Sequence, residues 1–275
     1  MKYTVAINSY KNAQMLSRCV RNAMSATKGL EAEIIVADSE TEEDTEMMMR
    51  EDFPNIHFFP HKKNVGMGAL ANCGLKHARG DYIFFINYDS IIDQEALINL
   101  GMYLDKNPDV GLVAPKVLNF DGSVQNTRFR FYSPITVLYR RTFLGKLAFA
   151  KKHLEQFTMK EFGNDEISEP DWIMGSAMMV RRREVKKIGG FDSRFFMYFE
   201  DTDLCRRYWE IGKKVIYFPK ARIYHFHGKG SANGGLIRSL LWNKLTWIHI
   251  DSALKYFWKY RGKSYPRNNA NLPKE

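Results

Sequence analysis

The first 115 residues alternate short apolar segments with longer amphipathic ones, and this alternation restricts the fold more than any other feature. Short strands joined by helices favour a mainly parallel sheet with right-handed crossovers, in which ligands bind beyond the carboxyl ends of the strands. The sequence therefore predicts an α/β fold, with a Rossmann-like, mainly parallel central sheet flanked by helices. The expected strands are Tyr3–Asn8, Glu33–Ala37, Ile56–Phe59, Tyr82–Ile86 and Val110–Ala114, and the expected helices are 13–24, Thr41–Arg50, Gly68–Ala78 and Gln94–Leu104.

The second half of the chain is less regular. From Asn119 to about Glu169 aromatic and basic residues follow without a clean period, which we interpret as an insertion or a flexible loop over a site. A strand over Trp172–Arg181, a helix over Glu200–Ile211 and a strand over Lys214–Phe218 are then expected. A long amphipathic helix over Leu236–Tyr260 should follow, with Leu254 and Trp258 on its apolar side.

The composition fits an ordinary globular protein, with 45% hydrophobic and 26% charged residues. The three cysteines are widely spaced and form no CxxC pair, which favours free thiols in a reducing compartment. The chain shows neither the apolar core of a signal peptide nor a run of roughly 18 apolar residues. We expect a cytoplasmic protein.

The net charge of +10 is concentrated at the C-terminus. Residues 228–275 contain nine lysines and arginines against two acidic residues, which gives +7. Such a tail suggests an anionic partner, either membrane headgroups or nucleic acid. A solvated helix face with a disordered end explains it equally well.

Three carboxylates follow an aromatic run within four positions, at Glu200, Asp201 and Asp203. At helical spacing Asp201 and Asp203 point about 200° apart, so all three cannot face one cleft. We expect one to be catalytic and the others to cap the helix or to pair with Arg206 or Arg207. Acids in a first helical turn also occur for electrostatic reasons alone.

Polar residues stand where expected strands end. Asp38 can accept hydrogen bonds from a ribose or a base, although a turn cap formed with Ser39 explains it as well. Asp89 follows a buried strand, where a carboxylate can hold a divalent cation, or can form a simple Asx turn. The glycines at 66 and 68 suit an anion site at a helix start or close packing on the sheet.

Downstream of these acids, His225 offers an imidazole nitrogen, which suits manganese better than magnesium. His227 lies two residues further on, and alternation would place both rings on one side of a strand. A lone histidine is usually structural. Two histidines together also fit a metal site.

Taken together, these motifs resemble the family 2 inverting glycosyltransferases, and within them the rhamnosyltransferase-like branch. The resemblance covers the chain from Val5 to about Ser231. The matching pieces are Asn8, Asp38, Asn64-x-Gly66-x-Gly68-x-x-x-Asn72-x-Gly74, Asn87-Tyr88-Asp89 in the place of the family's DxD, Asp171-Trp172-x-x-Gly175-Ser176-Ala177, Gly189-Gly190-Phe191-Asp192, Glu200-Asp201-x-Asp203-Leu204-Cys205 and Pro219-x-Ala221-x-x-x-His225.

The resemblance implies a GT-A fold and a role for each matching residue. Asp201 would be the general base, and Asp89 with His225 would bind Mn²⁺ or Mg²⁺ on the donor diphosphate. The donor would contact Asn8, Asp38, Asn64, Gly66, Asn72, Asn87 and Asp89, and the acceptor Trp172, Gly175, Ser176 and Glu200. Asn87 replaces the first acid of the family's motif, which weakens the case for a tightly held metal. Arg128 and Arg130 are suggested as alternative cations for the diphosphate.

By the same resemblance, residues 1–235 would form the glycosyltransferase domain and 236–275 a basic helix and tail. Residues 1–115 would bind the nucleotide and 116–235 the acceptor. The enzyme would move a sugar with inversion from a nucleotide donor, dTDP-L-rhamnose first and UDP-sugars next. The acceptor would be a glycan or a polyprenyl-diphosphate-linked glycan of bacterial-type cell-surface polysaccharide synthesis. Residues 236–262 would contact the inner membrane face, or pack on the catalytic domain.

Two other classes compete with an enzyme. A non-catalytic nucleotide-sugar or glycan-binding protein on the same fold is supported only by Asn87. A nucleic-acid-binding protein is suggested by charge alone, and no recognition motif of that class is present. We therefore expect no nucleic-acid partner.

Overall fold

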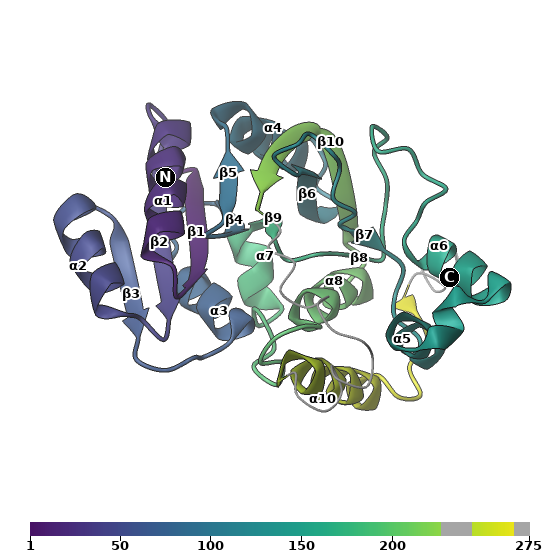
Figure 1. The fold of residues 1–275 in the computed structure, drawn as a ribbon. Coiled ribbons are helices and arrows are strands. Elements are labelled where there is room, and N and C mark those ends of the chain that lie inside the picture. The colour runs from purple at the N-terminus through teal and green to yellow at the C-terminus, as the bar shows by residue number, and fades with distance from the viewer. Residues whose placement is uncertain (227–243, 267–275) are drawn as a thin grey trace.

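The computed structural model describes residues 1–226 and 244–266 (Figure 1). An eight-stranded sheet in the order β3-β2-β1-β4-β9-β6-β10-β5 runs through its centre, and helices cover both of its faces. The strands of this sheet are β1 (Tyr3–Tyr10), β2 (Ala32–Ser39), β3 (His57–His61), β4 (Tyr82–Asn87), β5 (Ser90–Ile92), β6 (Val110–Leu118), β9 (Ala177–Arg181) and β10 (Lys214–His225). This confirms the predicted α/β class.

The helices divide into two layers. One apolar cluster packs α1 (Ala13–Thr27), α2 (Glu43–Asp52) and α4 (Gln94–Lys106) on one face of the sheet. The other face carries helices from both halves of the chain, and their cluster includes the ring of Tyr208, which is fully buried. These helices are α3 (Met67–His77), α7 (Arg182–Lys187), α8 (Glu200–Glu210) and α10 (Lys244–Lys259).

The sheet is mixed rather than purely parallel. Strands β1–β4 and the β6–β10 pair run parallel, whereas β9 runs antiparallel to both β4 and β6, and β5 antiparallel to β10. In the parallel part Asn8 pairs in register with Ala37 and with Asn87. The register therefore brings Asn8, Asp38 and Asn87 to one edge of the sheet, as the carboxyl-end rule requires.

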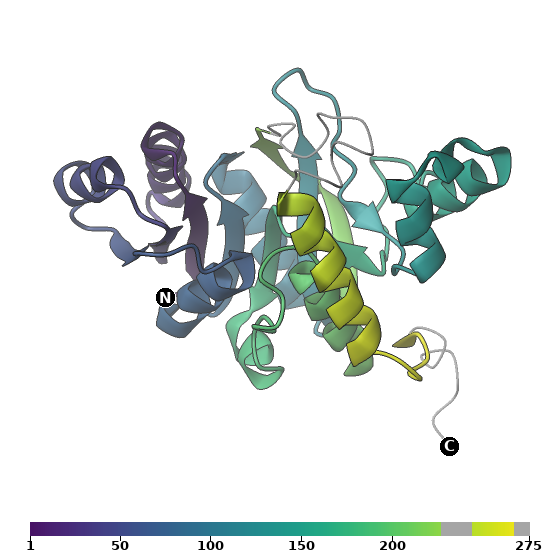
Figure 2. The same cartoon turned by 60° about the horizontal axis from the view of Figure 1, so that its bottom comes forward.

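The stretch interpreted as an insertion or a flexible loop contains regular structure, so the flexible loop is wrong and the insertion stays open. It holds β7 (Arg128–Phe129), α5 (Pro134–Arg141), the 3₁₀ helix η1 (Phe143–Lys146) and α6 (Ala148–Phe157). Ser133 and Thr136 form a capping box at the start of α5, and Pro134 occupies its first turn. Figure 2 shows α5 and α6 projecting beside the body, far from α2. Local caps thus fold a segment that has no clear apolar period.

The prediction of one continuous strand over Trp172–Arg181 is wrong, because the strand is interrupted between Ile173 and Ala177. The chain forms β8 (Trp172–Ile173), which pairs with β7, and then leaves extended pairing before β9 begins. In the gap the amide of Gly175 donates to Asp201 Oδ2 at 2.9 Å. The strand is interrupted because this backbone bonds a side chain of α8 instead of a neighbouring strand.

The C-terminal helix packs through a different face from the one expected. Its buried residues include Thr246, His249 and Ser252, whereas Leu254 and Trp258 are 66% and 69% exposed. The Ser252 hydroxyl donates to the carbonyl of Met197, and the His249 ring lies against aromatic rings before α8. The face that packs on the rest of the protein is therefore the one whose polar side chains have partners there, and the apolar face with Leu254 and Trp258 is exposed. Residues 236–243 of the expected helix, and His227, lie outside the described residues.

Candidate active site

A pocket of about 500 Å³ opens where the second half of the chain meets the carboxyl edge of the sheet. Elements far apart in sequence build it, since it receives side chains from β4, α5, α8, β10 and α10. The predicted site residues that line it are Asn87, Asp89, Trp172, Gly175, Ser176, Glu200, Asp201 and His225. The structure thus brings the metal candidates and the carboxylate candidates to one cavity.

Asp201 stands at the first turn of α8, and two backbone amides hold it. Its Oδ2 accepts from Gly175 at 2.9 Å, and its Oδ1 accepts from Thr202 at 2.7 Å. Burial raises the pKa of Asp201, and these two N–H donors oppose that effect because they stabilise the charged form. Asp201 is therefore a carboxylate fixed in orientation at the pocket wall.

Glu200 lies next to Asp201 in the same wall. Burial, and then the charge of Asp201, raise the pKa of Glu200 well above the ordinary carboxyl range. Two adjacent acids in a desolvated site do not ionise together easily. Since Asp201 alone receives two amide donors, Asp201 ionises first and Glu200 keeps its proton near neutral pH.

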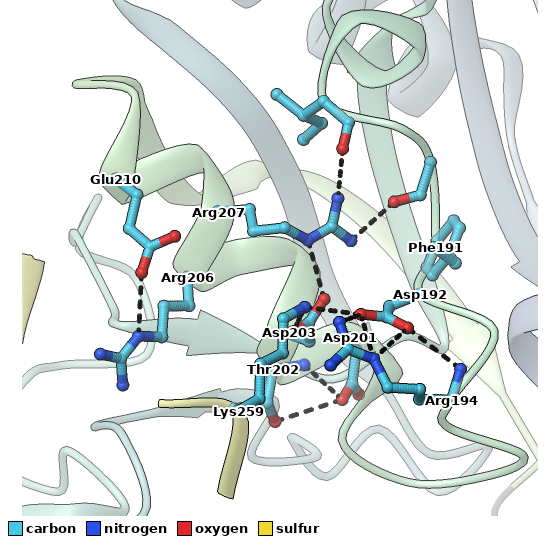
Figure 3. Close-up of polar contacts among 12 residues, drawn as sticks. Phe191, Asp192, Arg194, Asp201, Thr202, Asp203, Arg206, Arg207, Glu210 and Lys259 are labelled. Carbon is cyan, nitrogen blue, oxygen red and sulfur yellow. Dashed lines mark hydrogen bonds and ion pairs between the residues drawn. The ribbon is translucent and has the colours of Figure 1, made fainter. Parts of the chain in front are cut away.

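Asp203 points away from the pocket, as the helical spacing predicted. It is fully buried, and it accepts from Arg207 Nε at 2.8 Å and pairs with Lys259 (Figure 3). It also accepts from the Tyr260 hydroxyl at 2.8 Å. Lys259 Nζ also lies 2.7 Å from Asp192. Although burial favours the neutral acid, bonds from Arg194 and Lys259 hold the pKa of Asp192 well below its usual range. This network fastens α10 to α8.

An aromatic wall precedes α8. Tyr198 and Phe199 both have positive φ angles, 68° and 66°, which cost side-chain-bearing residues backbone strain. The Phe199 ring packs on Tyr132 with centroids 4.7 Å apart, and Trp172 stacks on Tyr132 with centroids 5.4 Å apart. The strained turn aims aromatic rings at the cavity and starts α8 at Glu200.

His225 and Asp89 lie next to each other in the pocket wall. His225 Nε2 lies 3.1 Å from Asp89 Oδ1, and Nδ1 lies 3.0 Å from Gln125 Oε1. The Gln125 amide nitrogen donates to the carbonyl of His225 at 2.8 Å, so its Oε1 is an acceptor and Nδ1 carries the hydrogen.

This geometry tests whether the pair fits a metal. With the hydrogen on Nδ1, a neutral His225 presents the lone pair of Nε2 to a carboxylate oxygen. Two acceptors at that distance need a shared proton or a cation. Gln125 supplies the outer hydrogen bond that orients metal-ligating histidines. The residues fit a divalent cation, although residues 1–226 and 244–266 hold no cluster of three or more His, Cys, Asp or Glu side chains.

Several buried polar oxygens along the sheet edge and pocket wall bond no protein group in the described part of the chain. Asp38 is the clearest case, since its side chain is fully buried and neither carboxylate oxygen caps a turn. Unpaired buried polar groups are rare and gather at functional sites. The set comprises Asn8 Oδ1, both carboxylate oxygens of Asp38, Asn87 Oδ1, Ser176 Oγ and Glu200 Oε2.

Other predicted donor residues are occupied by protein contacts. Asn72 donates to and accepts from the backbone of Phe191, both at 2.8 Å. At Gly66, with φ of 80°, a Cβ would lie 2.1 Å from the carbonyl of Phe196, and the amide of Met67 donates to that same carbonyl. Asn64 caps this turn through Gly66. Gly66 therefore allows close packing, the second of the two sequence interpretations.

Arg128 and Arg130 do not serve the pocket. Arg128 is 3% exposed and bonds the carbonyls of Phe162 and Gly163, with its guanidinium 4.3 Å from the Tyr217 ring centroid. Arg130 lies 3.5 Å from Asp171. The suggestion that they bind a diphosphate is not supported, because both are engaged elsewhere.

Sequence reasoning missed Gln125 and Arg140. Gln125 lies in the stretch without a period, and only the fold brings it to His225, 100 positions away. Arg140 lines the pocket from α5 and donates to the Tyr132 hydroxyl.

The sequence was compared with models of known families. The model described as Glycosyl transferase family 2 matches residues 4–189, about two thirds of the chain. This chain belongs to glycosyl transferase family 2. A second model, the N-terminal domain of galactosyltransferase, matches residues 165–229. The predicted family is confirmed.

Relatives of known name agree. N-acetylglucosaminyl-diphospho-decaprenol L-rhamnosyltransferase of Mycobacterium tuberculosis is 24% identical over 242 residues, 82% of this chain and 76% of that protein. Rhamnosyltransferase WbbL of Escherichia coli is 24% identical over 208 residues, 75% of this chain and 72% of that protein. The predicted rhamnosyltransferase-like branch is confirmed, and the chain is a nucleotide-sugar-dependent glycosyltransferase.

A solved structure shows the same fold. GalNAc-T7, in a crystal structure with UDP, GalNAc and Mn²⁺, superposes with a TM-score of 0.60 at 14% sequence identity. The match covers 82% of this chain and 44% of that one. The family 2 chain thus has the predicted GT-A fold. The described residues include no helix long and apolar enough to cross a bilayer.

Proposed function

We propose that this family 2 enzyme transfers a sugar with inversion, and that Asp201 is the general base. The observation that carries the proposal is that Asp201 and the Asp89–His225 pair line the same pocket. An acceptor hydroxyl placed beside Asp201 would give up its proton as its oxygen attacks the anomeric carbon. A single base with in-line displacement inverts that centre and needs no second nucleophile.

The donor would lie along the carboxyl edge of the sheet. Buried Asp38 oxygens would accept bonds from the nucleoside, and the Asn8 and Asn87 amides would flank the diphosphate side. Asp89 and His225 would hold Mn²⁺ or Mg²⁺, which neutralises the leaving diphosphate when bound. Asn64, Gly66 and Asn72 would shape the site from behind, through the packing of α3.

The acceptor would occupy the aromatic part of the pocket. Trp172 would line it, while Gly175 and Ser176 would lie beside the reacting hydroxyl. Glu200, which keeps its proton, would donate a hydrogen bond to the acceptor or donor sugar. By similarity to the two rhamnosyltransferases, we propose dTDP-L-rhamnose as donor and a polyprenyl-diphosphate-linked glycan as acceptor, in cell-surface polysaccharide synthesis.

This acceptor class would require work at a membrane surface. We propose a peripheral place on the cytoplasmic face, with residues 236–262 contributing to the contact. The domain division into residues 1–115, 116–235 and 236–275 would follow donor, acceptor and membrane roles. On α10, the exposed Leu254 and Trp258 are available for such a contact while the opposite face packs on the body.

The test is nucleotide release by purified protein, screened with dTDP-rhamnose, UDP-glucose, UDP-galactose and UDP-GlcNAc, with and without Mn²⁺. We expect release from one donor, dependent on Mn²⁺ or Mg²⁺ and absent in Asp201→Asn. Release that is unchanged in Asp201→Asn would exclude Asp201 as the base. Donor binding without release, when lipid-linked acceptor is supplied, would favour the non-catalytic binding protein.

A further inference from the structure

The segment from Pro134 to Phe157, here named the α5–α6 hairpin, exposes large apolar side chains that its own fold does not need. Phe143 is 71% exposed and Phe149 is 61% exposed. No large hydrophobic side chain in the described residues is more exposed than Phe143. Scattered apolar residues are ordinary on protein surfaces, but a group on one protrusion marks an interaction site. The others in the group are Ile135, Leu138 and Leu147, each above 40% exposed.

The hairpin is nevertheless well anchored, so these side chains are not exposed through local unfolding. Its inner side buries Ala150 and Phe157, and the Phe157 ring packs against Tyr132 with centroids 4.9 Å apart. Thr136 Oγ1 lies 2.7 Å from His153 Nε2, which ties α5 to α6. The hairpin thus has a packed inner face and an apolar outer face.

The charge of the hairpin identifies the kind of partner. Residues 134–157 contain five basic residues, namely Arg140, Arg141, Lys146, Lys151 and Lys152, and one acidic residue, Glu155. The three lysines are exposed. Bulky apolar side chains set among an excess of cations match the boundary of an anionic bilayer, where acyl chains meet negative headgroups. An acidic protein surface would match the charges but leave the phenylalanines unexplained.

The hairpin also adjoins the candidate active site. Arg140, on the last turn of α5, lines the pocket together with Tyr132 and Trp172. A membrane-anchored acceptor would present its diphosphate at headgroup depth, with its sugar above the surface. A bilayer contacting the hairpin would therefore place that diphosphate near Arg140 and the sugar near Asp201.

We propose that the α5–α6 hairpin is a membrane-docking surface that inserts Phe143 and Phe149 into an anionic bilayer. It thereby holds the acceptor pocket at the lipid surface. The proposal rests on the proposed function for its purpose, the use of a lipid-linked acceptor. Its physical claim, vesicle binding through this hairpin, concerns the protein alone.

The experiment measures binding of the full chain to vesicles of phosphatidylethanolamine and phosphatidylglycerol, against neutral phosphatidylcholine vesicles, by co-flotation. No donor or acceptor is added, so the result does not depend on whether transfer occurs. We expect binding to anionic vesicles. Phe143→Ser with Phe149→Ser should weaken it roughly tenfold or more. Exchanging Lys146, Lys151 and Lys152 for glutamine should weaken it by about fivefold per residue and reduce its salt sensitivity.

The matched control is Met24→Ser with Met102→Ser, two exposed apolar side chains on α1 and α4, 46% and 43% exposed. It should bind vesicles as the unmodified chain does. Circular dichroism and thermal unfolding verify that each variant is folded. Three results would overturn the proposal: no binding to anionic vesicles, equal binding by the hairpin variant, or a dimer that the phenylalanine exchanges convert to monomer. The last would assign the surface to a second copy of the chain.

Discussion

Two groups of acids lie within a few residues of each other on α8, and they differ in how they are paired. Asp203 is fully buried and bonded by Arg207, Lys259 and Tyr260. Glu200 and Asp201 face the pocket, where backbone amides hold Asp201 and Glu200 Oε2 bonds no described protein group. The pairing, rather than the residue type, separates an acid that holds the fold from one that is available to a substrate.

The same contrast extends to the cations. Arg207 and Lys259 are consumed by carboxylates and carbonyls between α8 and α10. On the hairpin, Lys146, Lys151 and Lys152 are exposed. The first group of basic residues holds parts of the fold together. The second group is exposed, and we propose that it contacts a bilayer.

The largest expected effect is on the pocket side. Asp201→Asn keeps the size of the side chain and an acceptor for one of its two amide contacts but removes its basicity, so turnover should fall by about 10²–10⁴-fold. Steady-state nucleotide release measures the loss, donor binding should stay near that of the parent chain, and circular dichroism verifies that the variant is folded. A variant that retains full turnover would move the base to another residue.

Changes in the network around Asp203 should lower the free energy of unfolding. Asp203→Ala leaves Lys259 and Arg207 beside an uncompensated buried gap, and we expect a loss of about 3–5 kcal/mol in the free energy of unfolding. Urea unfolding followed by circular dichroism measures it. A loss below about 1 kcal/mol, the range of an exposed pair, would show that the network is not structural.

Gln125→Leu tests whether the orientation of the His225 ring matters for metal binding by Asp89 and His225. It removes the acceptor for His225 Nδ1 while leaving both proposed ligands in place, so the apparent Mn²⁺ affinity should fall by about 10–100-fold. Mn²⁺ titration of turnover and of protein fluorescence reports it. Gln125→Glu, which keeps an acceptor oxygen, should retain most of the affinity. Equal affinity in all three proteins would remove Gln125 from the metal site.

Glu200→Gln should change the pH dependence of stability. Burial, and then the charge of Asp201, raise the pKa of Glu200 in the folded state above its unfolded value of about 4.3. The folded chain then holds a proton that the unfolded chain has lost, so the free energy of unfolding falls as pH rises above that value. Glutamine cannot lose a proton. The variant should match the parent near pH 4 and exceed it near pH 8, and urea unfolding at both values checks this.

The smallest effect is expected at Arg194. Its ion pair with Asp192 is 2.7 Å long, but the arginine side chain is 57% exposed. Because Lys259 also holds Asp192, Arg194→Ala should cost about 0–1 kcal/mol in the free energy of unfolding. The same urea assay measures it. A cost comparable with that of Asp203→Ala would mean that the network depends on its exposed edge.

Much of the fold followed from local sequence patterns. The apolar period predicted the type and place of β1–β4, β6, α1–α4 and α8, because backbone periodicity depends on neighbouring residues only. Helical geometry also predicted that Asp201 and Asp203 point apart, and the structure shows this. The free state of the cysteines agrees as well, with Cys19 and Cys205 buried as thiols and Cys73 half-buried.

The misses share a cause. The break between Trp172 and Ala177 comes from the bond between Gly175 and Asp201, 26 positions away. The packed face of α10 was decided by Met197 and the aromatic wall, against its own apolar stripe. The order within residues 134–157 rests on caps and on contacts with Tyr132. None of these three features can be predicted from the periodicity of apolar residues.

The sequence by itself determined the family, the alternating core of the fold and the two directions in which the acids of α8 point. Only the tertiary structure decided which acid is paired, which glycine is packed and which helix face remains exposed. The reason is physical: strand and helix periods are local properties of the chain. The burial and pairing of a charged group depend on whatever distant residue the fold brings within a few ångströms, as Lys259 does for Asp203.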